Sequence, residues 1–297
     1  MSALRRWLAG RAAVVGIPYV WLAVFFLLPF LVVAKISVSE METTTFKDIV
    51  AWKDGAIAFS LNFGNYLLLV QDSLYFSTFV SSLKYAAVTT LLCLTIGYPF
   101  AYFMARARAT LQPALLMLVM LPFWTSFLLR VYAWIGLLKN NGAINNVLMA
   151  LHVIDEPLVM MQTDFAVYVG IVYSYLPFMV LPLYTTLEKQ DLSLLEAAAD
   201  LGARPVTTFF RITLPLSVPG IIAGSLLVFI PAVGEYVIPS LLGRTDQLMI
   251  GRVLSDEFFA NRDWPVASAV AICMLILLIA PITLYQHFQS RALEKRA

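Results

Sequence analysis

One carboxylate in a strongly apolar part of the chain, Glu235, has the type and position that suit the handling of a charged solute. It lies near the middle of V-F-I-P-A-V-G-E-Y-V-I-P-S-L-L, residues 228–242. A carboxylate in hydrocarbon costs roughly 2.5–3.5 kcal/mol, so Glu235 must face protein or water. Two interpretations stay open: Glu235 lines a path and attracts a cation, or it pairs with a donor on a neighbouring helix or reaches the interface.

Aromatic side chains offer a second way to hold an ammonium group, because the face of an aromatic ring attracts cations. Single aromatic residues in apolar runs also serve as packing or interfacial residues, so each has this alternative. Asp263 and Trp264 place an acid beside an aromatic ring before the last apolar run, where a solute would enter. The candidate substrate-path residues are Glu235, Tyr236, Asp263, Trp264, Tyr173 and Tyr175.

Motifs for ATP binding, hydrolysis or metal chemistry do not occur in the sequence. It holds no G-x-x-x-x-G-K-[ST] phosphate loop, no H-E-x-x-H and no G-x-S-x-G. His152 and His287 have no partner at ligand spacing. We therefore assign no catalytic residue and no metal ligand, and a membrane enzyme or channel acting alone is the rival class.

The composition is that of an integral membrane protein. The chain has 297 residues, of which 61% are hydrophobic and 13% charged, and its mean hydropathy is +0.83. Soluble domains carry about 25% charged residues. The formal net charge of +2 gives no indication of nucleic-acid binding.

Six apolar runs are long enough to span a bilayer, which takes about 20 apolar residues per helix. We expect one transmembrane domain over residues 1–297. The expected spans are residues 12–36, 79–104, 113–138, 165–187, 218–242 and 266–288, and residues 188–215 form a polar segment between the fourth and fifth.

The distribution of Lys and Arg predicts that both termini and the 188–215 segment are cytoplasmic, because basic residues in short loops favour that side. The opposite loops hold Lys47, Lys53, Lys139, Arg244, Arg252 and Arg262. The cytoplasmic pieces hold 11 of the 20 basic residues: Arg5, Arg6, Arg11, Arg106, Arg108, Lys189, Arg204, Arg211, Arg291, Lys295 and Arg296.

Local signals in the 188–215 segment predict two short helices joined at Gly202. Ser193 and Glu196 have the spacing of a capping box, in which each side chain bonds the other's backbone. Gly202 suits the C′ position that ends the first helix, and Pro205 suits the first turn of the second. The expected apolar face of the second helix consists of Val206, Phe209 and Phe210.

This segment resembles the coupling region of permease subunits of bacterial binding-protein-dependent ABC importers. The family pattern is E-A-A, three residues, Gly, nine residues and I-x-L-P. The resemblance implies an all-α membrane protein with six transmembrane helices, the type I ABC importer permease fold, and a coupling helix that docks on an ATPase. The alternative is an amphipathic connector on the membrane surface. The expected ATPase-coupling residues are Glu196, Ala197, Ala198, Gly202, Arg204, Ile212, Leu214 and Pro215.

Residues 229–243 and 249–271 resemble more specifically the permeases of bacterial polyamine importers (Pot type). This resemblance implies ATP-driven import of a polyamine, putrescine or else spermidine, from periplasm to cytoplasm by alternating access. The family tends to carry an acid after the second proline, where this chain has Ser240, which leaves the preferred polyamine open. A permease for an amino acid, sulfate or iron is the alternative.

The same resemblance implies partners and a location. The partners are a second homologous permease subunit, two ATPase subunits, a periplasmic polyamine-binding protein and the lipid bilayer, with no nucleic acid. ATP and Mg are expected on the ATPase subunits, and no cofactor is expected on this chain. The expected location is the bacterial cytoplasmic (inner) membrane, with several passes.

Overall fold

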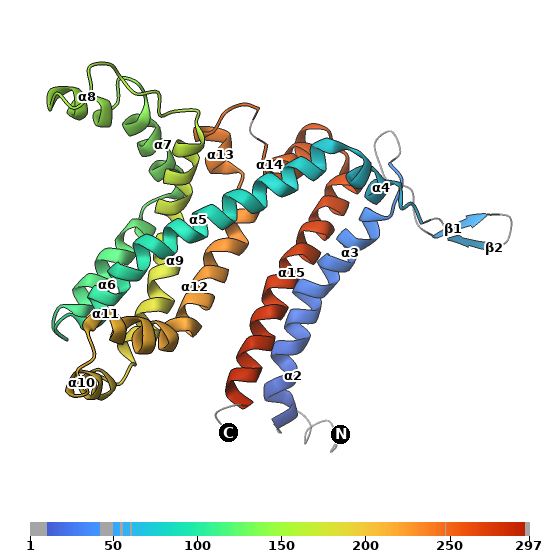
Figure 1. Ribbon diagram of the computed structural model, residues 1–297. Coiled ribbons are helices and arrows are strands. Elements are labelled where there is room, and N and C mark those ends of the chain that lie inside the picture. The colour runs from blue at the N-terminus through green and yellow to red at the C-terminus, as the bar shows by residue number, and fades with distance from the viewer. Residues whose placement is uncertain (1–10, 42–49, 54–55, 60, 247, 295–297) are drawn as a thin grey trace. The chain divides into compact units, whose positions relative to one another are not determined.

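The described chain is almost entirely helical. The computed structural model describes residues 11–41, 50–53, 56–59, 61–246 and 248–294 (Figure 1). Several basic residues used above to orient the chain lie outside these ranges: Arg5, Arg6, Lys47, Lys295 and Arg296. The chain packs as two compact units, one formed by residues 1–76 and 254–277 and the other by residues 77–253 and 278–297.

The smaller unit begins with a continuous helical run, α2 (Arg11–Leu22), η1 (Ala23–Leu27) and α3 (Leu28–Ser37). A β-hairpin follows, in which β1 (Val50–Lys53) pairs antiparallel with β2 (Ala56–Phe59). Asn65 in α4 (Gly64–Gln71) donates to the carbonyls of Ser37 and Ser39, both at 2.9 Å, and so fixes α4 to the end of α3. The π-helical turn η4 (Asp256–Ala260) and the first part of α15 (Trp264–Glu294) complete this unit.

The larger unit is a helical bundle that contains most of α5 (Ser73–Arg106). Apart from α5, its elements up to α9 are α6 (Gln112–Met120), the 3₁₀ turn η2 (Leu121–Trp124), α7 (Phe127–Leu138), α8 (Ala143–Ala150) and α9 (Asp164–Glu188). Those after α9 are α10 (Ser193–Asp200), α11 (Pro205–Thr208), the π-helical turn η3 (Phe209–Thr213), α12 (Leu214–Val233), α13 (Val237–Leu242) and α14 (Ile250–Ser255).

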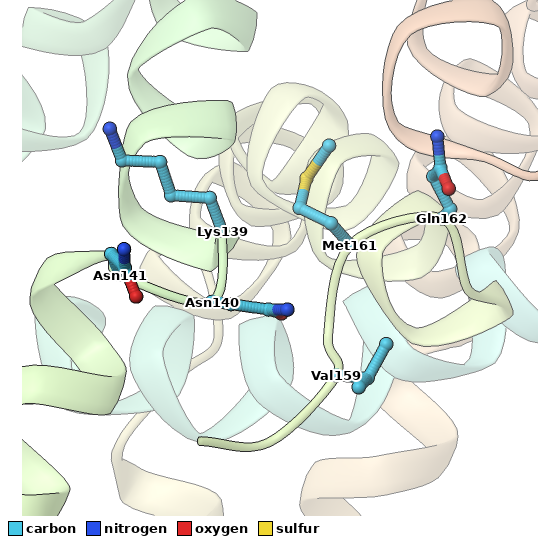
Figure 2. A pocket seen from close by; sticks show the side chains of 6 residues that line it. All are labelled: Lys139, Asn140, Asn141, Val159, Met161 and Gln162. Carbon is cyan, nitrogen blue, oxygen red and sulfur yellow. The ribbon is translucent and has the colours of Figure 1, made fainter.

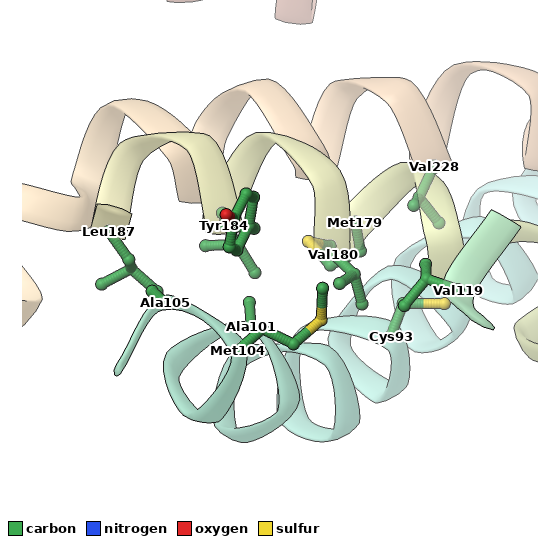
Figure 3. Close-up of a cluster of buried hydrophobic side chains, with 11 residues drawn as sticks. Cys93, Ala101, Met104, Ala105, Val119, Met179, Val180, Tyr184, Leu187 and Val228 are labelled. Atoms are coloured by element: carbon green, nitrogen blue, oxygen red, sulfur yellow. The ribbon is translucent and has the colours of Figure 1, made fainter. Parts of the chain in front are cut away.

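Helix α9 lies at the centre of the larger unit and packs against α12 and α5. Met179, Leu183 and Leu187 of α9 are fully buried in one apolar cluster with Met104 of α5 and Val228 of α12 (Figure 3). In a water-soluble protein, removal of such apolar side chains from water would drive folding. In a membrane, close packing of the side chains drives much of the association between helices.

Two glycines let α12 approach α9 closely. A Cβ on Gly220 would stand 2.8 Å from the Pro182 carbonyl oxygen and 2.6 Å from the Thr186 hydroxyl. A Cβ on Gly224 would stand 3.0 Å from the Met179 carbonyl oxygen. Small residues at such positions are typical of helix contacts in membranes, because they bring the two backbones together.

Within the described residues, five helical runs are long and apolar enough to cross a membrane, and a bent pair would make a sixth. The five are Val14–Ser37, Ser73–Arg106, Asp164–Glu188, Pro205–Val233 and Trp264–Thr283.

The expected span over residues 113–138 is not one continuous helix. Segments Gln112–Trp124 and Phe127–Ala150 meet at 89°. The carbonyl oxygen of Pro122 accepts from the Thr125 N–H at 3.3 Å, and also from Thr125 Oγ1 and Arg130 Nη1, both at 2.7 Å. The Arg130 guanidinium of α7 thus reaches back across the bend and bonds η2.

The expected span over residues 218–242 is also broken. Helix α12 ends at Val233, and α13 begins only at Val237. Continuing the helix would bring the ring of Pro239 against the carbonyl of Glu235 and leave that carbonyl without an N–H donor. The break places the Glu235 backbone outside a helix, and not within one as the apolar run suggested.

Candidate functional site

The predicted coupling segment forms two short helices joined at Gly202, which has φ +76°. The N–H of Gly202 donates to the Ala199 carbonyl at 2.9 Å, and the N–H of Ala203 donates to the Ala198 carbonyl at 3.0 Å. These two bonds form a Schellman motif, the expected end of a helix at a C′ glycine. Pro205 opens α11, after Arg204 as N-cap residue. Both local predictions are confirmed.

The predicted capping box is wrong. The N-cap residue of α10 is Leu192 and not Ser193, and its side chain makes no capping hydrogen bond. The Asp191 carboxylate instead accepts from the Ser193 N–H at 2.9 Å. Hydrogen bonds from Ser193 hold the pKa of Asp191 below its ordinary value. An Asp can fold back on the N–H two residues on, and this local bond takes the place of the Ser193–Glu196 pair.

The outer surface of the coupling segment combines polar and apolar side chains. Leu201 is 88% exposed, and Leu194, Val206 and Phe210 are exposed as well. Phe209 turns inward and meets the Tyr98 and Tyr102 rings of α5 edge-on. Of the expected coupling residues, Ala198 is buried, Ile212 and Leu214 are half-buried, and Glu196, Ala197, Gly202, Arg204 and Pro215 are exposed.

Glu235 lies in the break between α12 and α13 and is only 7% exposed. One carboxylate oxygen, Oε1, accepts from the N–H groups of Val237 and Ile238, at 3.0 and 3.3 Å. The other, Oε2, accepts from the Tyr175 hydroxyl of α9 at 2.6 Å. The carboxylate therefore holds the first turn of α13 and joins it to α9. Of the predicted path residues, Tyr175 and Glu235 are brought together.

The break carrying Glu235 is covered by α14. A Cβ on Gly251 would overlap the Gly234 carbonyl oxygen, so α14 rests directly on the backbone of the break. The N–H of Ile250 donates to the Ser82 hydroxyl of α5 at 2.8 Å and fixes the start of α14. Backbone, and not only side chains, thus holds Glu235 in place.

The other predicted path residues have different surroundings. Tyr236 is exposed, and Tyr173 packs edge-on against Trp134 with ring centroids 5.4 Å apart. Asp263 and Trp264 belong to the smaller unit. Asp263 Oδ1 accepts from the Val266 N–H at 3.1 Å, so this acid caps the first turn of α15.

A hollow beside the start of α9 was not predicted from the sequence. Side chains of Lys139, Asn140, Asn141, Val159, Met161 and Gln162 surround a volume of about 490 Å³ (Figure 2). Its lining residues lie between α7 and α8 and in the segment just before α9. This start of α9 is at the opposite end of the helix from α10 (Figure 1). Its charged lining group is an amine and none of its lining side chains is acidic, so it suits a carbonyl or anion and would repel a polyamine.

Among the described residues, no group of three or more His, Cys, Asp or Glu side chains is placed to hold a metal ion. The arrangement offers instead an exposed pair of short helices, α10 and α11, and one buried carboxylate with its tyrosine. Such groups can bind and guide a solute or a partner, and they do not form a nucleophile–base pair.

Comparison with known proteins finds relatives that share one name and match this chain over nearly its whole length. The spermidine/putrescine transport system permease protein PotB of Escherichia coli (strain K12) is 42% identical over 276 residues, which cover 93% of this chain and 96% of the relative. The protein of the same name from Haemophilus influenzae is 41% identical and covers 91% of both chains. Both relatives are transport permeases.

A solved bacterial alginate ABC transporter, in complex with a pentasaccharide-bound periplasmic protein, contains a chain with the same fold. The TM-score is 0.75 at 16% identity, and the match covers 98% of this chain and 96% of that one. The fold is therefore that of type I ABC importer permeases.

The family profile described as "Binding-protein-dependent transport system inner membrane component" matches residues 94–295. Because this match spans more than half of the sequence and the relatives align over more than nine-tenths of it, the chain belongs to this family of multi-pass inner-membrane permeases of ABC importers.

Proposed function

We propose that this chain is the permease subunit of an ATP-driven importer that moves a polyamine from the periplasm to the cytoplasm. Putrescine is the first solute to test and spermidine the second. The observation that carries the proposal is the high similarity, over nearly the whole chain, to permeases named for spermidine and putrescine. The buried carboxylate of Glu235 supports a cationic solute.

The coupling segment supports the ATP-driven part of the proposal. ATP and Mg are bound by two separate ATPase subunits, onto which the exposed α10 and its neighbouring Leu201 dock. A second homologous permease completes the pathway, and a periplasmic binding protein delivers the polyamine. ATP binding closes the ATPase dimer, and the coupling segments convert this closure into outward opening. Both chain termini lie in the cytoplasm in this arrangement.

Glu235 and Tyr175 contribute the cation preference. An ionised carboxylate has about four acceptor positions, and three are taken by the α13 amides and the Tyr175 hydroxyl. An ammonium group can occupy the remaining position without breaking the cap of α13. Its attraction is strong because the site is shielded from water, where screening is weak.

Two measurements test this function. The tagged chain, purified from its native membrane, is expected to bring an ATPase subunit with it, which a channel or enzyme acting alone would not. In proteoliposomes with the loaded binding protein, labelled putrescine uptake is expected to need ATP and to be competed by spermidine. Competition by sulfate, iron or an amino acid, and not by polyamines, would assign another solute to the same architecture.

A further inference from the structure

Both ends of the coupling segment meet at one side chain, Gln190. This residue follows α9 and precedes α10, and its Nε2 donates to the carbonyl oxygen of Thr213, which closes η3, at 3.1 Å. Thr213 is almost completely buried. The segment that contains α10 and α11 is therefore a closed loop, tied at its base by one amide.

The same amide reaches a third element. Gln190 Oε1 accepts from Arg106 Nη2 at 3.2 Å, and Arg106 is the last residue of α5. A guanidinium only donates and a carbonyl only accepts, so the orientation of the Gln190 amide is determined by its two partners. A hydrogen bond from a charged donor is stronger than a neutral one. The end of α5 is thus joined to the base of the coupling segment.

The position of Arg106 is itself constrained. Its guanidinium carbon lies 5.5 Å from the centre of the Tyr102 ring, in a cation–π contact. Its Nε is buried and finds no hydrogen-bond partner among the residues that the structure describes, which makes the contact through Nη2 the more important. A cation at the last turn of α5 also suits the negative end of the helix dipole.

Aromatic contacts join η3 to α5 beside this polar link. The Phe209 ring lies 5.7 Å from that of Tyr98 and 6.2 Å from that of Tyr102. The Tyr98 hydroxyl lies 2.9 Å from the Ser217 hydroxyl of α12. Single π-helical turns such as η3 are frequent at functional sites. These contacts hold α5 beside η3, at one end of the coupling segment. The bond between Arg106 and Gln190 joins α5 to the other end of the segment as well.

We propose that Gln190 and Arg106 are positioning residues for coupling: they make the coupling segment and α5 move together when the ATPase moves. Without this link, force on α10 would reach α5 only through the aromatic contacts of η3 and the packing of α5 against α9, and α5 would follow less completely. The proposal rests on the proposed function, because it assigns a route for the force that the ATPase delivers.

The test compares solute imported with ATP hydrolysed, in the complete complex in proteoliposomes, with putrescine and the loaded binding protein. Arg106→Met removes the bond to Gln190 and is expected to lower this ratio by about tenfold, as expected from the loss of one hydrogen bond to a charged group. Gln190→Leu also removes the bond to Thr213 and is expected to lower the ratio by at least as much. The double variant is expected to be no worse than Gln190→Leu alone, because that change already breaks the bond to Arg106. The amount of ATPase that co-purifies is expected to stay unchanged.

Two matched controls come from the same turn. Gln112→Leu removes a half-buried amide that donates to the carbonyls of Ala105 and Ala107 and does not reach Gln190. Arg108→Met removes an exposed cation two residues beyond Arg106. Both controls are expected to keep the parental ratio, so that a general loss of charge or of a glutamine is separated from the loss of the link.

A parental ratio in Gln190→Leu, or a double variant that falls by the product of the two single effects, would overturn the proposal. If Gln190→Leu fails to assemble, Arg106→Met decides from the other side of the same bond. Failure of the proposed function would be seen earlier and separately, as a parental complex that holds no ATPase or imports no putrescine.

Discussion

Gly202 gives the sharpest test of the coupling segment, because its backbone conformation favours glycine and its surroundings leave room for a side chain. Its φ is +76°, and a Cβ added there would meet nothing within 4 Å. Gly202→Ala therefore adds only the strain of a left-handed alanine, about 1–2 kcal/mol. Since each 1.4 kcal/mol is a factor of ten, the Schellman end of α10 loses population to relaxed ends by up to about 5- to 30-fold.

The assay is ATPase stimulation by the loaded binding protein in the reconstituted complex. Gly202→Ala is expected to lower stimulation by a factor within that range, with normal insertion and normal co-purification of the ATPase in detergent. Gly202→Asn is the matched control, because Asn adopts the left-handed region far more readily than other non-glycine residues. Equal stimulation in the parental, Asn and Ala complexes would show that the end of α10 does not set the docking geometry.

Three other positions give measurable outcomes. Glu235→Gln keeps an acceptor for the α13 amides and removes the charge, so putrescine uptake is expected to fall about tenfold while thermal stability is retained. Glu235→Ala is expected to lower both uptake and thermal stability. If Glu235→Gln takes up putrescine at the parental rate, the charge is not needed. Gly251→Ala pushes a Cβ against the Gly234 carbonyl and is expected to destabilise the protein by about 1–3 kcal/mol in detergent unfolding, while Gly136→Ala, with open space around it, is expected to unfold as the parent does. The pKa of Asp191 is lowered in the folded state, so the stability that its carboxylate contributes is present above its ordinary pKa and is lost as pH falls through the lowered pKa. Asp191→Ala is therefore expected to reduce hydrogen-exchange protection at the start of α10 at neutral pH. A difference between variant and parent that persists below the lowered pKa would contradict this.

The coupling segment could be predicted because its signals are local. A glycine at C′ and a proline at N1 each act through their own backbone, so Gly202 and Pro205 stand where the sequence places them. The capping box failed for an equally local reason: a carboxylate on Asp191 competes for the N–H of Ser193, and spacing alone does not rank the two caps.

The two broken spans could not be read from hydropathy, which measures composition and not direction. The bend after Trp124 depends on Arg130, whose bond to the Pro122 carbonyl forms only once the chain has turned. The break at Glu235 had a sequence signal, since Gly234 and Pro239 flank it, but the Tyr175 partner comes from 60 residues away. Likewise, nothing in the sequence pairs Gln190 with Arg106, because their contact spans 84 residues.

The coupling segment and Glu235 lie toward opposite ends of one helix pair, α9 and α12, and this pair links them mechanically. Near the coupling segment, Gly220 packs on the Pro182 carbonyl; further along, Gly224 packs on Met179. Beyond these contacts the Tyr175 hydroxyl bonds Glu235, in the break just after α12. The two helical segments thus contact each other at three successive positions along their length. Because packed interiors do not deform continuously, this packing resists sliding of one helix along the other. A tilt imposed at Gln190 must therefore be shared by both helices as far as the carboxylate, unless the Tyr175–Glu235 bond breaks. Tyr175→Phe in the complete complex distinguishes a tilt that reaches Glu235 through this bond from one that does not, because the variant removes the bond and leaves the glycine contacts intact.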